Sequence, residues 1–150
     1  MQTTYSQLMR FYHRFGKFYT KQFTPLLAET GLSMREMHVL LFLANNPERN
    51  RAADIVRGRG MSKGHVSLSL RSLEDRGLVA CQADGTDRRA IHLALTDGAG
   101  EIAEDGRAVQ REFIRRLREG ITPEESAVIL SVTRKMGDNI RAMERERGSI

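Results

Sequence analysis

Hydrophobic positions recur at helical spacing along most of the chain. From about residue 5 to residue 28, apolar side chains lie three or four positions apart, which predicts a long N-terminal helix. The apolar stripe of this helix is broad and rich in aromatic side chains. A stripe of this width is typical of a helix that a second copy of the chain covers, although an ordinary core helix has the same pattern.

Three shorter helices are predicted after the first, and their approximate bounds are 33–45, 51–57 and 62–76. Ser33 and Glu36 form a capping-box pattern at the start of the first of these three. The glycine-rich segment 57–60 predicts a sharp turn between the second and the third. Ser62 is a suitable N-cap for the third helix, and Gly77 ends it.

Residues 78–95 break the helical pattern. Two short runs, 78–83 and 90–95, resemble strands, and the second alternates as a half-buried strand does. These runs predict a β-hairpin whose tip, residues 84–89, is longer than a two-residue turn and carries paired arginines. Such a tip is either a solvated turn or an extension that contacts a partner.

Two long helices are predicted in the C-terminal third of the chain. Thr96 caps the first, although Gly98, Gly100 and Gly106 weaken its start. The sequence Thr-Pro-Glu-Glu at 122–125 is typical of a helix start and predicts the second. The chain is therefore expected to be mainly α with a small β-hairpin.

The positive charge of the chain is concentrated in its middle. The net charge is +5 over 150 residues. Residues 49–90 contain nine Lys and Arg against five Asp and Glu, whereas the remaining residues contain fifteen against fourteen. A concentration of this kind favours a protein that binds phosphates.

Composition restricts the class of protein further. A chain of this length forms about one domain. Cys81 is the only cysteine, which excludes an internal disulfide, and the longest apolar run, 39–44, is too short to cross a membrane. The first residues lack the apolar core of a signal peptide. We expect a soluble, cytoplasmic protein that has no membrane partner.

The central helices and the hairpin together form the pattern of a winged helix-turn-helix, a nucleic-acid-binding unit. On a helical wheel with about 100° per residue, Val66 and Leu73 share the core face of helix 62–76. The outward arc carries side chains suited to base edges and phosphates, namely Lys63, Gly64, Ser67, Leu68 and Arg71. Gly64 permits close approach of the backbone, and Leu68 is placed to meet a thymine methyl group.

The segment MSKGHVSLSLRSLEDRGLV, followed by DGTDRRAIHLALT, resembles the recognition helix and wing of MarR-type transcriptional regulators. The resemblance rests on a Leu-x-x-x-Gly-Leu-Val stretch, an Asp-x-Arg wing tip and a Leu-Thr exit. The matching positions are Leu73, Gly77, Leu78, Val79, Asp87, Arg89, Leu95 and Thr96. Two features depart from the family pattern: Leu68 lies where the family often has Arg, and two glycines, Gly98 and Gly100, replace a single one.

The resemblance implies a sequence-specific DNA-binding transcriptional regulator, a ligand-responsive repressor that acts as a homodimer on a pseudo-palindromic operator in double-stranded DNA. It implies one MarR-like domain over residues 1–150, in which helices 5–30 and 97–147 form the dimer and residues 32–96 form the winged lobe. The expected DNA-binding residues are Ser62, Lys63, Gly64, His65, Ser67, Leu68, Arg71, Asp87, Arg88 and Arg89. The expected residues for a small-molecule effector are Tyr12, His13 and His38.

The sequence does not match the residue patterns of catalytic or metal-binding sites. His65, Ser67 and Asp75 do not form a triad, because they share one helix and the first two point in different directions. The four histidines lie in four elements without a metal-binding spacing, so we expect no enzyme activity, metal site or cofactor. Cys81 is expected to be a small packed residue rather than a redox sensor.

Two binding functions are alternatives to a sequence-specific regulator. One is an architectural or RNA-binding winged-helix protein, which would lack the roughly thousandfold preference of a regulator for its site over random DNA. The other is a protein-interaction module with a degenerate wing, which would not bind DNA even at low salt.

Overall fold

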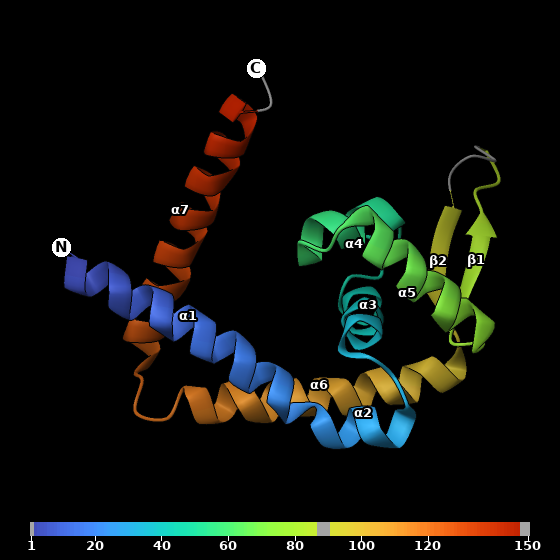
Figure 1. Ribbon diagram of the computed structural model, residues 1–150, viewed down its shortest axis with the longest axis horizontal. Helices are drawn as coiled ribbons and strands as arrows, with labels where there is room; N and C mark the ends of the chain where they lie inside the picture. Colours follow the sequence, from blue (N-terminus) through green and yellow to red (C-terminus); the bar gives the residue numbers. More distant parts are fainter. Residues whose placement is uncertain (1, 87–90, 148–150) are drawn as a thin grey trace. The chain divides into compact units, whose positions relative to one another are not determined.

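The computed structural model describes residues 2–86 and 91–147. In these residues the chain forms seven helices and one hairpin (Figure 1). The elements are α1 (Gln2–Gln22), α2 (Thr24–Thr30), α3 (Met34–Asn45), α4 (Ala52–Arg59), α5 (Lys63–Asp75), β1 (Val79–Ala83), β2 (Ile91–Leu95), α6 (Asp97–Leu117) and α7 (Pro123–Arg147). The expected fold class, mainly α with a small hairpin, is confirmed. The chain divides into two compact units, residues 1–113 and residues 114–150.

Helix α3 is the centre of the first unit. Its fully buried side chains are Met37, Val39, Leu40 and Leu41. The helix contacts α4, α5 and β2, so apolar neighbours surround it, as is usual for a helix that is hydrophobic on every side. Its start is the predicted capping box: the Glu36 N–H donates to Ser33 Oγ (3.3 Å), and the Ser33 N–H donates to Glu36 Oε2 (2.6 Å).

Helix α6 packs closely on α3 at Gly106. A Cβ atom at this position would lie 3.0 Å from Leu41 Cδ2 and 3.1 Å from Met37 Sδ, so a side chain here would force the core to move. At the start of the helix, the Ala99 N–H donates to Thr96 Oγ1 (3.4 Å). This cap begins α6 at Asp97, although two glycines lie in the first turn.

The N-terminal segment forms two helices, so the prediction of a single helix over residues 5–28 was wrong. Helix α1 ends at Gln22 and α2 begins at Thr24, with the fully buried Phe23 between them. The interruption has a local cause in Pro25, which lies in the first turn of α2. Proline has no N–H, and in a continuous helix its ring would clash with the carbonyl four residues earlier.

The aromatic stripe of α1 is covered in part within the first unit. The rings of Phe15 and Tyr19 each lie 5.3 Å from the ring of Phe113 in α6, and Gln110 Nε2 donates to the Tyr19 hydroxyl (2.7 Å). The aromatic members of the stripe that are exposed are Tyr5, Phe11, Tyr12 and Phe18. One face of α1 therefore belongs to the core, and a neighbouring face carries uncovered aromatic rings.

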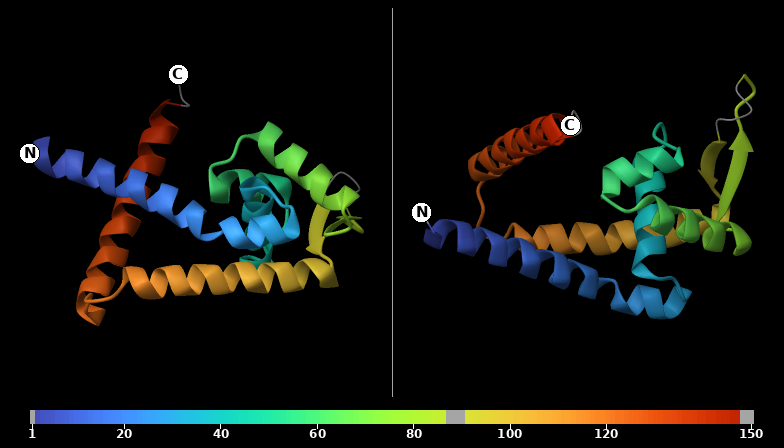
Figure 2. Two further views of the ribbon diagram at one scale, coloured as in Figure 1. Left: turned by 60° about the horizontal axis from the view of Figure 1, so that its bottom comes forward. Right: turned by 45° about the horizontal axis from the view of Figure 1, so that its top comes forward.

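The hairpin is antiparallel, and its strands agree with the predicted runs to within one residue. Val79 pairs with Leu95, and Cys81 pairs with Leu93. Val79 and Leu93 are buried, which fixes the base of the hairpin on the core. The remainder projects from the group formed by α3, α4 and α5 (Figure 2).

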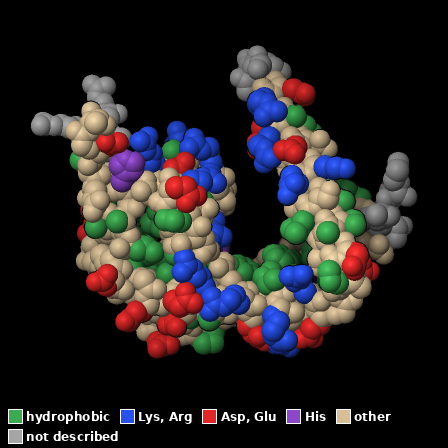
Figure 3. All heavy atoms as spheres, turned by 180° about the vertical axis from the view of Figure 1, so that it is seen from behind, with side chains coloured by type: hydrophobic (Ala, Val, Ile, Leu, Met, Phe, Trp, Pro, Cys, Tyr) green, Lys and Arg blue, Asp and Glu red, His purple; other side chains and the backbone are tan. Residues whose placement is uncertain are grey.

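Helix α7 forms most of the second unit. Its start is the predicted capping box, in which the Thr122 N–H donates to Glu125 Oε2 (2.9 Å) and the Glu125 N–H donates to Thr122 Oγ1 (3.2 Å). None of its described side chains is buried, and hydrophobic side chains lie at its surface among Lys and Arg (Figure 3). Among the described helices, none combines the length and the apolar character that a membrane span requires.

Candidate nucleic-acid interface

Helix α5 has a buried face and an exposed face. Its buried side chains are Val66, Ser69 and Leu73. Ser62 Oγ accepts a hydrogen bond from the His65 N–H (3.2 Å), which caps the first turn as predicted. The residues expected to face a partner are all exposed, namely Ser62, Lys63, Gly64, His65, Ser67, Leu68 and Arg71. The two faces lie where the helical wheel places them, and contact with DNA stays a prediction.

Two glycines shape the connection from α4 to α5. A Cβ atom at Gly58 would lie 2.2 Å from the Phe42 ring, so α4 approaches α3 more closely than any side chain would allow. Gly60 ends α4 with a φ of 62°, a conformation that favours glycine. The segment predicted as a turn is therefore helical up to Arg59, and the chain turns at Gly60.

A groove of about 660 Å³ lies between α4 and α5. Apolar side chains line it together with Ser67, Glu74 and three cationic side chains, Arg57, Lys63 and Arg71. Lys and Arg side chains also gather along one edge of the winged lobe (Figure 3). Arg57 was not among the predicted site residues. It lies three positions after Asp54 and is ion-paired to it at 2.8 Å. This spacing is that of an ordinary pair on a helix surface, so nothing in the sequence distinguishes Arg57. Donors at the edge of such a groove are the groups that contact phosphate oxygens.

The tip of the hairpin carries the remaining predicted DNA-binding residues. Asp87, Arg88 and Arg89 lie outside the described residues. Before them, Asp84 Oδ1 accepts hydrogen bonds from the Thr86 N–H (3.1 Å) and the Thr86 hydroxyl (2.9 Å). This local turn of the Asx type leads from β1 into the tip.

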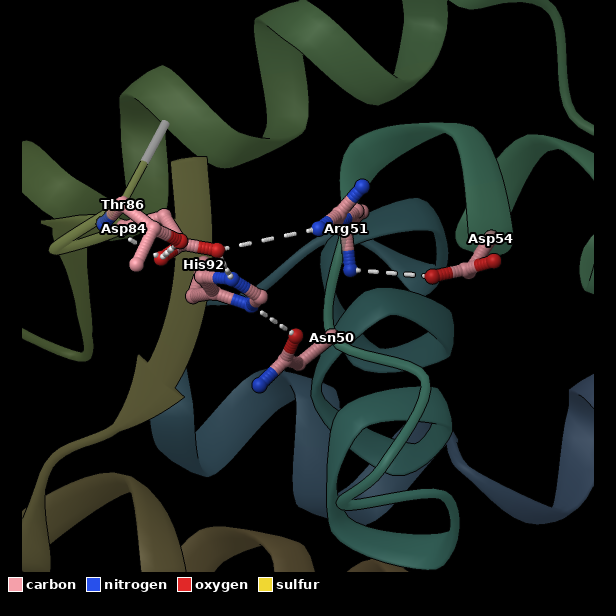
Figure 4. A network of polar contacts seen from close by, with 6 residues as sticks. All are labelled: Asn50, Arg51, Asp54, Asp84, Thr86 and His92. Carbon is pink, nitrogen blue, oxygen red and sulfur yellow. Dashed lines mark hydrogen bonds and ion pairs between the residues drawn. The ribbon is translucent and has the colours of Figure 1, made fainter. Parts of the chain in front are cut away.

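A polar network joins the end of the hairpin nearest its tip to the residues before α4 (Figure 4). His92 Nδ1 lies 2.6 Å from Asn50 Oδ1, and His92 Nε2 lies 3.1 Å from Asp84 Oδ2. Arg51 Nη2 lies 4.0 Å from the same oxygen of Asp84. Hydrogen bonds from the Thr86 N–H and from His92 lower the pKa of Asp84 to about 2, so its carboxylate is ionised at neutral pH. The sequence did not reveal this network because 42 positions separate Asn50 from His92 and no motif links them.

A model of the MarR family matches residues 30–90 of the chain. This range contains α3, α4, α5 and β1, which are the helix-turn-helix and the first strand of the hairpin. This part of the chain is that of a MarR-type winged helix-turn-helix transcriptional regulator.

Relatives and solved structures are similar to the chain over most of its length. YdgJ of Bacillus subtilis, named as an uncharacterized HTH-type transcriptional regulator, is 24% identical over 115 residues, which cover 77% of this chain and 70% of YdgJ. MepR of S. aureus, solved as a complex with DNA, has a TM-score of 0.72 at 21% identity, covering 90% of this chain and 97% of MepR. BpsR of Bordetella bronchiseptica, whose DNA binding is regulated by 6-hydroxynicotinic acid, has a TM-score of 0.68 at 21% identity, covering 87% of this chain and 98% of BpsR.

The second half of α5 in this MarR-type lobe is fixed by polar contacts to α2 and α3. Ser72 Oγ donates to Glu36 Oε1 (2.5 Å), and the Arg76 guanidinium donates to the carbonyls of Thr30 (2.6 Å) and Gly31 (3.1 Å). Burial by itself would raise the pKa of Glu36, but the hydrogen bonds from Ser72 and from the α3 cap outweigh it and lower the pKa. A charged Glu36 therefore connects the start of α3 to α5.

The predicted effector residues lie on two helices. Tyr12 and His13 are exposed on α1, and His38 is half-buried on α3. Burial, together with the positive charge of Arg59, lowers the pKa of His38 and favours its neutral ring. In the part of the chain that the structure describes, no hydrogen bond or ring contact joins His38 to Tyr12 or His13, so their shared role stays a prediction.

Arg59, at the end of α4, is a further residue that the sequence did not single out. Its Nε is buried and has no hydrogen-bond partner among the described residues. Burial lowers the pKa of this guanidinium, and the hydroxyl of Tyr19 opposes that effect. A buried donor without a partner is still able to form a hydrogen bond.

Cys81 is exposed, so the prediction of a packed residue was wrong. The hairpin leaves the core after Val79, which is the one buried residue of β1. Partial burial of the thiol raises its pKa, and a hydrogen bond to Glu74 and the charge of that carboxylate raise it further. The protonated thiol, which is the less reactive form, is therefore favoured.

Two other predictions concern chemistry outside DNA binding. In residues 2–86 and 91–147, no group of three or more His, Cys, Asp or Glu side chains is placed to hold a metal ion. His65 and Ser67 are both exposed on α5, and the family and the relatives above are transcriptional regulators rather than enzymes.

Proposed function

We propose that the protein is a sequence-specific, ligand-responsive repressor that acts as a homodimer on a pseudo-palindromic operator. The observation that carries this proposal is the exposed face of α5, which presents Lys63, Gly64, Ser67, Leu68 and Arg71. Three of these side chains also line the groove between α4 and α5, namely Lys63, Ser67 and Arg71. The exposed face offers hydrogen-bond donors, a site of close backbone approach and one apolar group. The fold shared with MepR, which was solved with DNA, supports the proposal.

We propose that the winged lobe binds DNA and that the N- and C-terminal helices form the dimer. Residues 32–96 form the DNA-binding part, in which α5 lies in the major groove and Ser62 and His65 lie near its entrance. Asp87, Arg88 and Arg89 of the tip contact phosphates or the adjacent minor groove. Helices 5–30 and 97–147 form the dimer and place the two copies of α5 about one turn of DNA apart, roughly 34 Å.

The proposed effector is a small organic anion. His38 is half-buried, the positive charge of Arg59 acts on its ring, and the Nε of Arg59 is a buried donor without a described partner. Tyr12 and His13 complete the proposed set from α1. The similarity to BpsR supports a small-molecule response, and 6-hydroxynicotinic acid is a suitable first probe of DNA release.

The proposal includes no catalytic step, metal or cofactor. It places the protein in the cytoplasm together with the DNA that it binds.

The decisive experiment is selection of bound fragments from the organism's own genomic DNA, followed by titration of the selected sequence and of random duplex at fixed salt. We expect a preference for the selected site of at least about a thousandfold. Equal affinity for all sequences would instead support an architectural protein. Absence of DNA binding at low salt would support a protein-interaction module.

A further inference from the structure

The hairpin and the residues before α4 are joined by a histidine that has an oxygen atom at each ring nitrogen (Figure 4). On one side Asn50 Oδ1 lies 2.6 Å from Nδ1 of His92, and on the other Asp84 Oδ2 lies 3.1 Å from Nε2. The backbone supports the same junction, because the Leu93 N–H donates to the Asn50 carbonyl (2.8 Å). His92 therefore bridges two segments that are far apart in sequence.

The geometry determines the protonation state that suits this bridge. A neutral imidazole has one N–H donor and one acceptor nitrogen, whereas an imidazolium has two donors. With the Asn50 amide oriented as in the structure, the oxygen atoms on both sides of His92 both accept hydrogen bonds only when both ring nitrogens carry a proton. The carboxylate of Asp84 is ionised far below neutral pH, so it is an acceptor under all ordinary conditions.

Other charged groups surround the bridge. From the segment before α4, Arg51 Nη2 lies 4.0 Å from Asp84 Oδ2, so this carboxylate faces two cationic groups when His92 is charged. From α4, the Asp54 carboxylate accepts from the Arg51 N–H (3.2 Å) and pairs with Arg57. The charged tip residues 87–89 lie outside the described residues. Among the side-chain types in this set, imidazole is the one whose charge ordinarily changes near neutral pH.

We propose that His92, as an imidazolium, positions the wing by joining Asp84 of the hairpin to Asn50 beside α4, and that loss of its proton releases the wing and weakens DNA binding. The inference rests on the proposed DNA-binding function. A released wing is free to move relative to α4 and α5, so the protein must order it again when it binds. Affinity falls for every sequence, because the wing contacts the backbone or groove shape rather than individual bases.

The first measurement concerns the free protein and needs no DNA. In the ¹⁵N-labelled full-length chain, nuclear magnetic resonance reports how many protons the His92 ring carries between about pH 5.5 and pH 8.5. We expect two ring protons at the lower pH and, as one is lost, a change in the backbone signals of Gly85 and Thr86. If the Asn50 amide rotated so that its NH2 group faced His92, a neutral ring could form hydrogen bonds to both Asn50 and Asp84. A ring with a single proton throughout this range, with unchanged Gly85 and Thr86 signals, would therefore overturn the proposal.

The second measurement is the affinity for a mixed-sequence duplex of about 30 base pairs, long enough for two half-sites, at constant ionic strength. Between about pH 6 and pH 8, wild type should lose about fivefold more affinity than His92→Gln, which corresponds to about 1 kcal/mol at 1.4 kcal/mol per tenfold. Asn50→Asp keeps an acceptor at Nδ1 in every rotamer and should move the loss to higher pH. Gln82→Ala alters the residue opposite His92 in the hairpin and should retain the wild-type response.

The outcomes separate this proposal from the function on which it rests. An identical pH response of wild type and His92→Gln contradicts the role of His92, even if both bind tightly. A wild-type protein that binds the duplex at neither pH contradicts the DNA-binding function, while the ring measurement still tests the bridge.

Discussion

Leu68 is exposed to 68% at the centre of the outward face of α5. The neighbouring outward residues Lys63, Gly64, Ser67 and Arg71 are polar or lack a side chain, so the leucine is the one apolar group on this arc. An exposed leucine on an ordinary surface contributes little and is common. On a helix that enters the major groove, the same side chain has one distinctive partner, the methyl group of thymine.

Replacing Leu68 by alanine should therefore change specificity more than affinity. We expect Leu68→Ala to bind random DNA nearly as well as wild type and to lose up to about 1 kcal/mol of preference at one A·T pair of the selected operator. The measurement is titration against the operator and against its single-pair variants at fixed salt. Loss of affinity by the same factor for every sequence would show that Leu68 has another role.

Lys63 should show the opposite behaviour, because a lysine at a groove edge acts as a point charge on phosphate. We expect Lys63→Ala to weaken binding to all duplexes by a similar factor. The slope of log affinity against log salt should fall by about 1. Lys17→Ala, an exposed lysine of α1, is the matched control and should leave the slope unchanged. An unchanged slope for Lys63→Ala would place this residue away from the phosphates.

At the scale of elements, the position of α5 depends on a buried carboxylate. Glu36 accepts hydrogen bonds from the N–H of Ser33 and the hydroxyl of Ser72, and so connects the cap of α3 to α5. These bonds lower the pKa of Glu36. A lowered folded-state pKa adds stability above the unfolded-state pKa, and that stability is lost as the pH falls through the folded-state pKa.

Glu36→Gln should destabilise the fold in a pH-dependent way. At pH 7 we expect the free energy of unfolding to fall by about 1–2 kcal/mol, since a charged acceptor of two hydrogen bonds is replaced by a neutral one. The difference from wild type should shrink as the pH falls below the ordinary pKa range of a glutamate, because the stability that the lowered pKa adds is lost there. Urea unfolding at pH 7 and at a pH below that range measures both quantities. Glu29→Gln, at an exposed position of α2, is the control. If Glu36→Gln lowered the free energy of unfolding equally at both pH values, this account would be contradicted.

The elements that the sequence predicts well are those with local causes. Ser33 with Glu36 and Thr122 with Glu125 each satisfy donors within one turn, so the starts of α3 and α7 follow from four consecutive residues. The break between α1 and α2 also has a local cause in Pro25, which the periodicity of the aromatic stripe concealed.

The parts of the site that the sequence does not predict depend on contacts between distant segments. Asn50 meets His92 across 42 positions, and Ser72 meets Glu36 across 36. The buried Nε of Arg59 likewise results from tertiary packing rather than from any local pattern. The outward face of α5, by contrast, follows from helical period alone once the helix is known.

At the scale of the whole molecule, the exposed apolar surface of α7 favours a partner that covers it. The exposed hydrophobic side chains of α7 are Val128, Ile129, Leu130, Val132, Met136, Ile140 and Met143. All except Leu130 fall on one face of the helix when about 100° is allowed per residue. Monomeric proteins rarely expose a contiguous stripe of this kind, which supports the proposed homodimer. The exposed rings of Phe11, Tyr12 and Phe18 on α1 are consistent with the same conclusion.

A charge placed in the stripe of α7 should separate the subunits without unfolding them. Val132 is 47% exposed, so a glutamate there meets water in the isolated chain, whereas a subunit interface would bury the charge. Loss of a buried valine and desolvation of a carboxylate together should raise the dimer dissociation constant at least about a hundredfold. Sedimentation velocity across a range of concentrations measures this change, and operator affinity should fall with it because one half-site alone is then bound. Ser131→Glu, about 100° around the same helix, introduces an identical charge outside the stripe and should remain dimeric. A Val132→Glu protein that stays dimeric at the lowest measurable concentration would exclude the stripe of α7 from the interface and leave the exposed rings of α1 to form it.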